Sequence, residues 1–262
     1  MAVFRSTSAR LSVICVALAA VVGLVVTGPA TAASSGDELL PTAGSVRQIA
    51  TLEYLISPDY AGVAPLRRIL TPQASDESRR SIQGLGTLND LAGELVIFKG
   101  VPYRVPVSGT PQRVPDARTT PFAQAIAFSP QASQVVPPNT TCAQLPEIID
   151  DLAGTDSGMV AVRVSGVMRE LITRSVPRQT IPYPPLADVI AEQTEFDLGQ
   201  PRAVLVGFRQ GADLAGLGAA GLHLHGLTTD LTGGGHVLSC RIGKAHIAIQ
   251  RVIDVVVYGS DE

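Results

Sequence analysis

The last third of the 262-residue chain is almost continuous strand signal. Four segments rich in β-branched and aliphatic residues follow one another there, at residues 203–208, 221–228, 236–242 and 246–258. Helical periodicity is confined to short stretches, at residues 45–56, 66–70, 146–152 and 186–193. Because strands outnumber helices, the sequence predicts an α+β protein built from two sheet-based halves with few flanking helices.

Two hairpins are expected upstream of this region. Their strands are predicted at residues 94–98, 101–105, 159–164 and 167–176, with turns at Lys99–Gly100 and at Ser165–Gly166. A polar segment at residues 129–141 is expected to be a loop, and it divides the two halves. We therefore expect an N-terminal sheet subdomain at residues 34–135 and a C-terminal sheet subdomain at residues 136–262.

The chain begins with the pattern of a secretory signal peptide. A basic start precedes an apolar run at residues 11–26, and a Gly28–Pro29 pair precedes the small residues of a cleavage site. An uncleaved membrane anchor is disfavoured because the run is short for a span. We expect cleavage near Ala32 or Ala33, after which the protein is secreted or stays in the cell envelope. The signal peptide at residues 1–33 would then be the chain's one contact with a membrane.

The composition describes a globular domain rather than a nucleic-acid binder. The chain is 45% hydrophobic and 16% charged, which is enough for a sizeable core. Its net charge is -3, and no basic run alternates with aromatic residues. Nucleic acid is therefore excluded as an expected partner.

Removal of the signal peptide would leave two cysteines, Cys142 and Cys240. Disulfides persist in the compartments outside the cytoplasm, so the two residues have the chemistry to pair there. Two separate small residues in the core fit the sequence equally well. The pairing stays open at this level.

Three of the four histidines fall within fourteen residues. His223 and His225 point to the same face of a strand, because side chains alternate along it. Glycines 233–235 allow the chain to reverse, so His236 opens the next strand beside them. Three histidines with an open fourth position are typical of catalytic zinc, although a different divalent metal fits as well. The competing interpretation is a set of buried strand histidines that bind backbone carbonyls; a cupin site is disfavoured because its glutamate is missing.

The chain resembles the α-acetolactate decarboxylases from about residue 48 to residue 257. Seven segments carry the resemblance in family order: GLGTLNDLAGE at 84–94, KGVPYR at 99–104, TPFA at 120–123, TRSVP at 173–177, PYPPL at 182–186, VGF at 206–208 and GGGHVL at 233–238. The resemblance implies an acetolactate decarboxylase, a zinc lyase that converts 2-acetolactate to acetoin and CO2. The implied ligand is a small 2-hydroxy-3-oxo acid, and the implied assembly is a homodimer.

The resemblance also assigns site residues. His223, His225 and His236 would bind the zinc, and Glu94 would be the carboxylate beside the metal. Arg174 would hold the substrate, since a guanidinium matches a planar carboxylate, and Thr87 would line the pocket. Without the resemblance, a solvated strand end at Glu94 and a surface ion pair at Arg174 are the simpler interpretations.

The sequence also departs from the family pattern. Members of the family carry a second glutamate in a longer tail, and no residue here matches it, since Glu262 ends the chain. Asp90 and Ala92 stand where the family has His and Asp. These departures keep open a relative that binds a metal and an oxo acid without turnover. A zinc hydrolase with an unrelated substrate is a third and weaker alternative.

Overall fold

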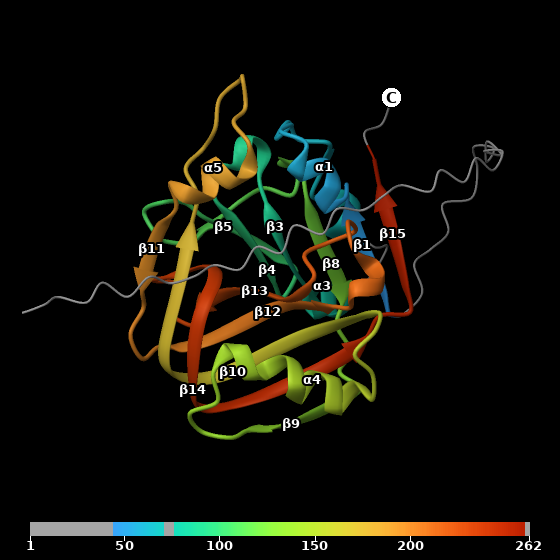
Figure 1. The fold of residues 1–262 in the computed structure, drawn as a ribbon, viewed down its shortest axis with the longest axis vertical. Helices are drawn as coiled ribbons and strands as arrows, with labels where there is room; N and C mark the ends of the chain where they lie inside the picture. The colour runs from blue at the N-terminus through green and yellow to red at the C-terminus, as the bar shows by residue number, and fades with distance from the viewer. Residues whose placement is uncertain (1–43, 71–75, 260–262) are drawn as a thin grey trace, which may run out of the picture. The chain divides into compact units, whose positions relative to one another are not determined.

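Two large β-sheets form the framework of residues 44–70 and 76–259, the parts of the chain that the computed structural model describes (Figure 1). The first sheet has the order β15-β1-β8-β3-β4-β5-β6, with β1 (Ser45–Ile49), β3 (Ile82–Thr87), β4 (Glu94–Phe98), β5 (Val101–Val105), β6 (Gln112–Arg113), β8 (Ala123–Ala127) and β15 (Asp254–Tyr258). The second has the order β11-β10-β12-β13-β14-β9, with β9 (Ala132–Val136), β10 (Met159–Ser175), β11 (Thr194–Asp197), β12 (Arg202–Gln210), β13 (Gly221–Thr228) and β14 (Gly234–Arg251). A small pair joins β2 (Ala64–Pro65) to β7 (Thr119–Thr120).

The helices are short. They are α1 (Leu52–Ile56), α2 (Arg67–Leu70), α3 (Asp76–Ser81), α4 (Leu145–Ala153) and α5 (Leu186–Ala191), with 3-10 turns η1 (Asn89–Leu91), η2 (Cys142–Gln144) and η3 (Ala212–Leu214). A capping box between Thr141 and Gln144 precedes α4, and left-handed Gly154 ends it. Within the described ranges, no helix has the length and apolar character needed to cross a membrane.

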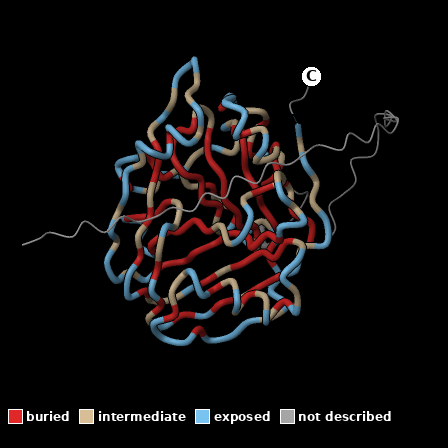
Figure 2. The backbone as a smooth tube through the Cα atoms, in the orientation of Figure 1, coloured by how far each residue is buried: buried red, intermediate tan, exposed pale blue. Residues whose placement is uncertain are grey.

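The core lies between the two sheets and beneath the helices that cover them (Figure 2). Val96 of β4 packs with Val206 of β12, so the two sheets share one apolar layer. On its other face the second sheet is covered by α4, which buries Leu145 and Ile149 against it. Few helices and two sheets confirm the α+β fold class. The site described below lies where the two sheets face each other.

The sheets do not divide the sequence into two continuous halves. The expected boundary between residues 135 and 136 falls inside β9, which pairs with β14 of the second sheet. The last strand, β15, returns to the first sheet and pairs in parallel with β1. The expected signal peptide, residues 1–33, lies outside the described residues.

The helix predicted over residues 45–56 is wrong in its first half. Residues 45–49 form β1, which pairs with β15 on one side and β8 on the other, and only Leu52–Ile56 is helical. A strand buried on both faces lacks period-two alternation, so its apolar residues fitted a helical stripe equally well.

The turn predicted at residues 165–166 is also wrong, because β10 runs unbroken from Met159 to Ser175. Gly166 instead permits a close approach of β14: a Cβ atom there would lie 2.2 Å from the carbonyl oxygen of Lys244. The loop predicted at residues 129–141 contains β9, an exposed edge strand whose polar residues gave little strand signal.

Candidate functional site

Three histidine side chains converge at the hairpin of β13 and β14. His223 and His225 share one face of β13, and His236 is the direct cross-strand partner of His225. The Nε2 atom of His223 lies 3.2 Å from Nε2 of His225 and 3.2 Å from Nδ1 of His236. The latter two nitrogens are 3.3 Å apart. All three ring nitrogens therefore face one point.

The sequence of the hairpin explains this convergence. The Thr228 hydroxyl accepts hydrogen bonds from the backbone N–H groups of Thr232 and Gly233, which fixes the turn. Gly235 has φ +127°, and a Cβ atom there would lie 2.4 Å from the Arg174 carbonyl oxygen. Only glycine fits this position. Because it has no side chain, β10 can pack closely against the start of β14.

The three imidazoles are held neutral. Burial, reinforced by the charge of Arg174, lowers the pKa of His223 to about 4. Burial also holds the pKa values of His225 and His236 well below the ordinary histidine value. His225 Nδ1 lies 2.8 Å from the Leu95 carbonyl oxygen, so Nδ1–H donates there and leaves the Nε2 lone pair for the cluster. Neutral imidazole is the form that binds metals.

The spacing of the nitrogens fits a metal ion. Two ligands about 2.0–2.1 Å from a tetrahedral zinc ion are separated by about 3.3 Å. The observed separations are 3.2, 3.2 and 3.3 Å. Among the described residues, these histidines form the group whose ligand atoms lie close enough to share an ion.

A buried ion pair lies beside the histidines. Arg174 of β10 donates from Nη1 to Glu94 Oε1 at 2.7 Å, and Glu94 Oε2 lies 3.5 Å from His225 Nε2. The side chains are only 12% and 7% exposed, so neither is a solvated surface group. Burial raises the pKa of the Glu94 carboxyl, although the charge of Arg174 opposes this. The structure therefore brings both predicted residues to the histidine cluster.

Thr87 also reaches this site, although its hydroxyl is occupied. It is the cross-strand partner of Glu94 in the ladder of β3 and β4, and its side chain is buried. Its Oγ1 donates to the Gly93 carbonyl oxygen at 3.0 Å. Thr87 therefore supports the strand end that presents Glu94 and lines the wall beside it.

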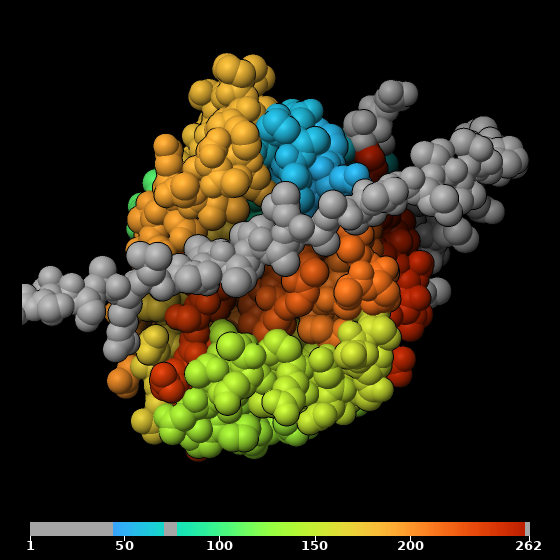
Figure 3. Space-filling view, viewed as in Figure 1, coloured from blue at the N-terminus to red at the C-terminus, as the bar shows by residue number. Residues whose placement is uncertain are grey.

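A cavity of about 210 Å³ joins these groups, and most of its wall is apolar. α1 contributes Leu52 and Leu55, and α5 contributes Ile190, with Leu186 at its start. Figure 3 shows the segments of α1 and α5 meeting on the surface above the site. Sequence reasoning missed this wall, although Leu52 and Leu55 belong to the apolar stripe found at residues 45–56.

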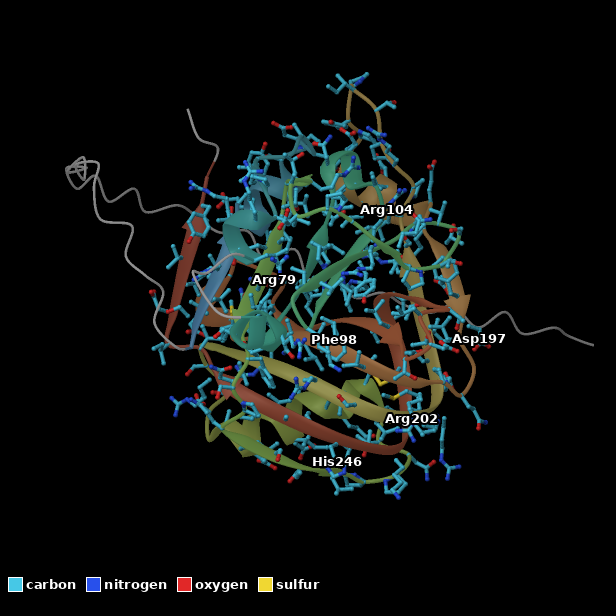
Figure 4. All side chains as sticks on the ribbon, turned by 180° about the vertical axis from the view of Figure 1, so that it is seen from behind. Arg79, Phe98, Arg104, Asp197, Arg202 and His246 are labelled. Atoms are coloured by element: carbon cyan, nitrogen blue, oxygen red, sulfur yellow. A yellow bond between two sulfur atoms is a disulfide. The ribbon has the colours of Figure 1, made fainter. Side chains whose placement is uncertain are left out.

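The remaining polar groups of interest lie elsewhere. His246 is exposed on β14 next to edge strand β9, at the bottom of the view in Figure 4. Glu94 is the one carboxylate among the described residues that line the cavity. Glu262, the last residue, lies outside the described ranges.

Comparison with known proteins places the chain in a family. The sequence model of the alpha-acetolactate decarboxylase family matches residues 48–260. The alpha-acetolactate decarboxylase of Raoultella terrigena is 34% identical over 197 residues, which cover 75% of this chain and 73% of that protein. The Klebsiella aerogenes protein of the same name is 36% identical, over 61% of each chain.

A solved structure agrees with the sequence matches. The crystal structure of alpha-acetolactate decarboxylase from Bacillus subtilis strain 168 superimposes with a TM-score of 0.76 at 26% identity. The superposition covers 83% of this chain and 90% of that chain. The chain is therefore an enzyme of the carboxy-lyase class and belongs to the alpha-acetolactate decarboxylase family.

Proposed function

We propose that the mature protein is an exported, zinc-dependent enzyme that converts 2-acetolactate to acetoin and CO2. One observation carries the chemical part of this proposal: three neutral imidazoles with converging nitrogens share a cavity with the Glu94–Arg174 pair. His223, His225 and His236 would hold the metal. When bound, a divalent ion supplies Lewis-acid polarisation of the keto and hydroxyl oxygens of the substrate.

The reaction needs an electron sink and a proton. The bond between the carboxylate carbon and C2 breaks, its electron pair moves toward the neighbouring keto group, and neutral CO2 leaves. C2 then takes up one proton to give acetoin. The chain's own residues must therefore orient the carboxylate, disfavour its charge and deliver that proton.

Arg174 and the apolar wall serve the first two needs. The guanidinium donates from Nη1 to Glu94, and its remaining N–H groups can bind the substrate carboxylate and fix its direction. The side chains of Leu52, Leu55 and Ile190 exclude water around it. A poorly hydrated carboxylate is less stable relative to neutral CO2, so this wall favours bond cleavage.

Glu94 serves the third need. Burial raises its pKa, which makes the carboxyl a better proton carrier than an exposed glutamate. Oε1 is bound to Arg174, whereas Oε2 faces the histidines, so Oε2 is the oxygen that would pass a proton to C2.

Acetoin formation tests the proposal. Purified mature protein, loaded with zinc and given racemic 2-acetolactate, should form acetoin faster than the spontaneous reaction. A chelator should abolish this excess and added zinc should restore it. Equal rates with and without protein would refute the proposal.

A second candidate function is binding without catalysis, because the cavity has a single carboxylate among the described residues. A chain in which Glu94 alone does not complete proton transfer would bind a metal and a 2-hydroxy-3-oxo acid without turnover. Calorimetry with a non-decarboxylating analogue separates the two functions. Tight binding with no acetoin favours the binding protein, whereas turnover that Glu94→Gln abolishes favours the enzyme.

Export draws independent support from the bond between Cys142 and Cys240. Disulfides persist in oxidising compartments and are rare in the cytosol of most cells. Expression of the full chain in a bacterium should yield protein outside the cytoplasm. Its intact mass should correspond to a chain cleaved near Ala32 or Ala33. Light scattering of that protein also tests the homodimer that the family resemblance implies.

A further inference from the structure

Asp90 ties together two segments that border the cavity but lie far apart in the sequence. It sits in η1, between β3 and β4. Its carboxylate accepts a hydrogen bond from the Tyr183 hydroxyl at 2.6 Å and one from Arg178 Nε at 3.1 Å. Its carbonyl oxygen accepts from the Gln179 backbone N–H at 2.7 Å. Asp90 thus binds three residues of the segment that follows β10.

The backbone at this residue also needs outside support. Asp90 has φ +61° and Leu91 has φ +51°, so two successive residues that are not glycine are left-handed. Leucine rarely adopts this conformation, and it persists where surrounding contacts hold it. The backbone N–H of Asp90 binds a fourth residue through a 2.8 Å hydrogen bond to the Tyr60 carbonyl oxygen. The strained backbone turns Leu91 into the cavity wall.

The other tied segment also ends at the cavity. Arg178 follows Arg174 by four residues, and Tyr183 precedes Leu186 of the wall by three residues. The Tyr183 ring packs 5.0 Å from the ring of Tyr60, whose own hydroxyl donates to the Pro184 carbonyl oxygen at 2.7 Å. Movement of this segment would therefore displace Leu186 and strain the end of the strand that carries Arg174.

We propose that Asp90 is a positioning residue, which through Tyr183 fixes the Glu94–Arg174 pair and the Leu91–Leu186 wall for decarboxylation. The inference rests on the proposed function, because positioning is defined by the reaction. Asp90 stands four residues before Glu94, and its bonded partners stand a few residues after Arg174. It joins the strand that presents the carboxylate to the strand that presents the guanidinium.

Tyr183 is the stronger of the two side-chain partners. Asp90 is only 15% exposed, but its partner Arg178 has a side chain that is 63% exposed. Water therefore screens the ion pair between them. The hydrogen bond to Asp90 raises the pKa of Tyr183 to about 12. The Tyr183 hydroxyl is therefore a proton donor to Asp90 throughout the physiological pH range.

The test compares Tyr183→Phe, Asp90→Ala and the double variant in the full mature protein loaded with zinc. Tyr183→Phe keeps the ring that packs on Tyr60 and removes only the hydroxyl. We expect kcat/KM for 2-acetolactate to fall about tenfold in Tyr183→Phe, mainly through kcat, with zinc content unchanged. Asp90→Ala should lose at least as much, and adding Tyr183→Phe to it should cost nothing further, because the bond is already absent.

Two controls match these changes away from the cavity. Tyr103→Phe removes a hydroxyl from β5, and Asp116→Asn breaks the 3.5 Å ion pair with Arg79. Both should retain wild-type kcat/KM. Hydrogen exchange of backbone amides adds a readout that does not depend on turnover: Tyr183→Phe should speed exchange in residues 88–94 and 177–186 together.

The outcomes separate this inference from the proposed function. If the wild type makes no acetoin but Tyr183→Phe speeds exchange in both segments, the Asp90–Tyr183 hydrogen bond does join the segments and the proposed reaction is wrong. Positioning for that reaction is then overturned with it. If the wild type turns over and Tyr183→Phe matches Tyr103→Phe in kcat and in exchange, the positioning role of Asp90 is wrong. Additive losses in the double variant would also overturn it.

Discussion

Arg174 lies directly opposite His236 in the ladder of β10 and β14, while its guanidinium reaches Glu94 on β4, 2.7 Å away in the other sheet. One residue of β10 therefore fixes the spacing between a ring of the histidine cluster and the carboxylate. Because Arg174 also pairs with Glu195 of β11, this spacing is set by a sheet rather than by a loop. Strands hold such geometry more tightly than loops do.

Removal of one histidine should release the metal. We expect His225→Ala to weaken zinc binding more than about a hundredfold, because loss of even an outer partner of a metal ligand costs 10–100-fold. Zinc content after dialysis against a competing chelator measures this. His246→Ala changes an exposed histidine of β14, the strand that also carries His236, and should retain the wild-type zinc content. Equal zinc retention in both variants would show that the cluster is not the metal site.

Glu94→Gln should separate proton delivery from metal binding. Glutamine keeps the shape and can accept the Arg174 hydrogen bond, but it cannot pass on a proton at C2. We expect kcat to fall about 10²–10⁴-fold, the usual contribution of a positioned acid or base, with zinc content unchanged. Acetoin assays and metal analysis of the same sample measure both. Wild-type kcat in Glu94→Gln would assign the proton to another group.

The histidine cluster could be predicted because its geometry is local. Strand alternation puts His223 and His225 on one face, and the glycine turn returns His236 beside them. The family resemblance pointed to Glu94 and Arg174, but spacing along the chain could not pair them, since 80 residues separate them. That pairing depends on how two sheets face each other, which is a tertiary property.

The errors in secondary structure have the same origin. β1 lies between two strands of its sheet and is buried on both faces, so the local pattern that separates strand from helix is lost. Gly166 looks like a turn residue in the sequence, yet it is needed because the backbone of β14 passes too close for a side chain. The contacts of Asp90 likewise could not be predicted from the sequence, since Tyr183 lies 93 residues away along the chain.

Asp90 should contribute to stability in a pH-dependent way. Burial alone would raise its pKa, but hydrogen bonds from Tyr183 and Arg178 outweigh burial and hold the pKa below the ordinary value. An unfolded aspartate has a pKa of about 3.9, so the ionised carboxylate stabilises the fold above that pH. This contribution is lost as the pH falls through the lower folded-state pKa.

The comparison of wild type with Asp90→Asn isolates this effect from other titrating groups. At pH 7 we expect the variant to be about 1.5–2 kcal/mol less stable, the lower part of the range for hydrogen bonds to charged groups. The difference should shrink below about pH 4 as Asp90 becomes protonated in the wild type. Denaturant unfolding at several pH values measures it. A difference that does not change between pH 7 and pH 3 would contradict the role of the charge.

The bond between Cys142 and Cys240 should stabilise the second sheet without affecting the reaction. It joins η2, which leads into α4, to β14, and it closes a loop with a sequence separation of 98. A cross-link over so long a loop restricts the unfolded chain, so its loss should cost about 2–5 kcal/mol. Neither cysteine lines the cavity, so kcat and zinc content should be unchanged at temperatures where the variant is folded. Urea unfolding of wild type and the double variant Cys142→Ser/Cys240→Ser, each with and without reductant, tests this. Reductant should destabilise only the wild type; equal sensitivity in both, or none in either, would show that the bond does not contribute.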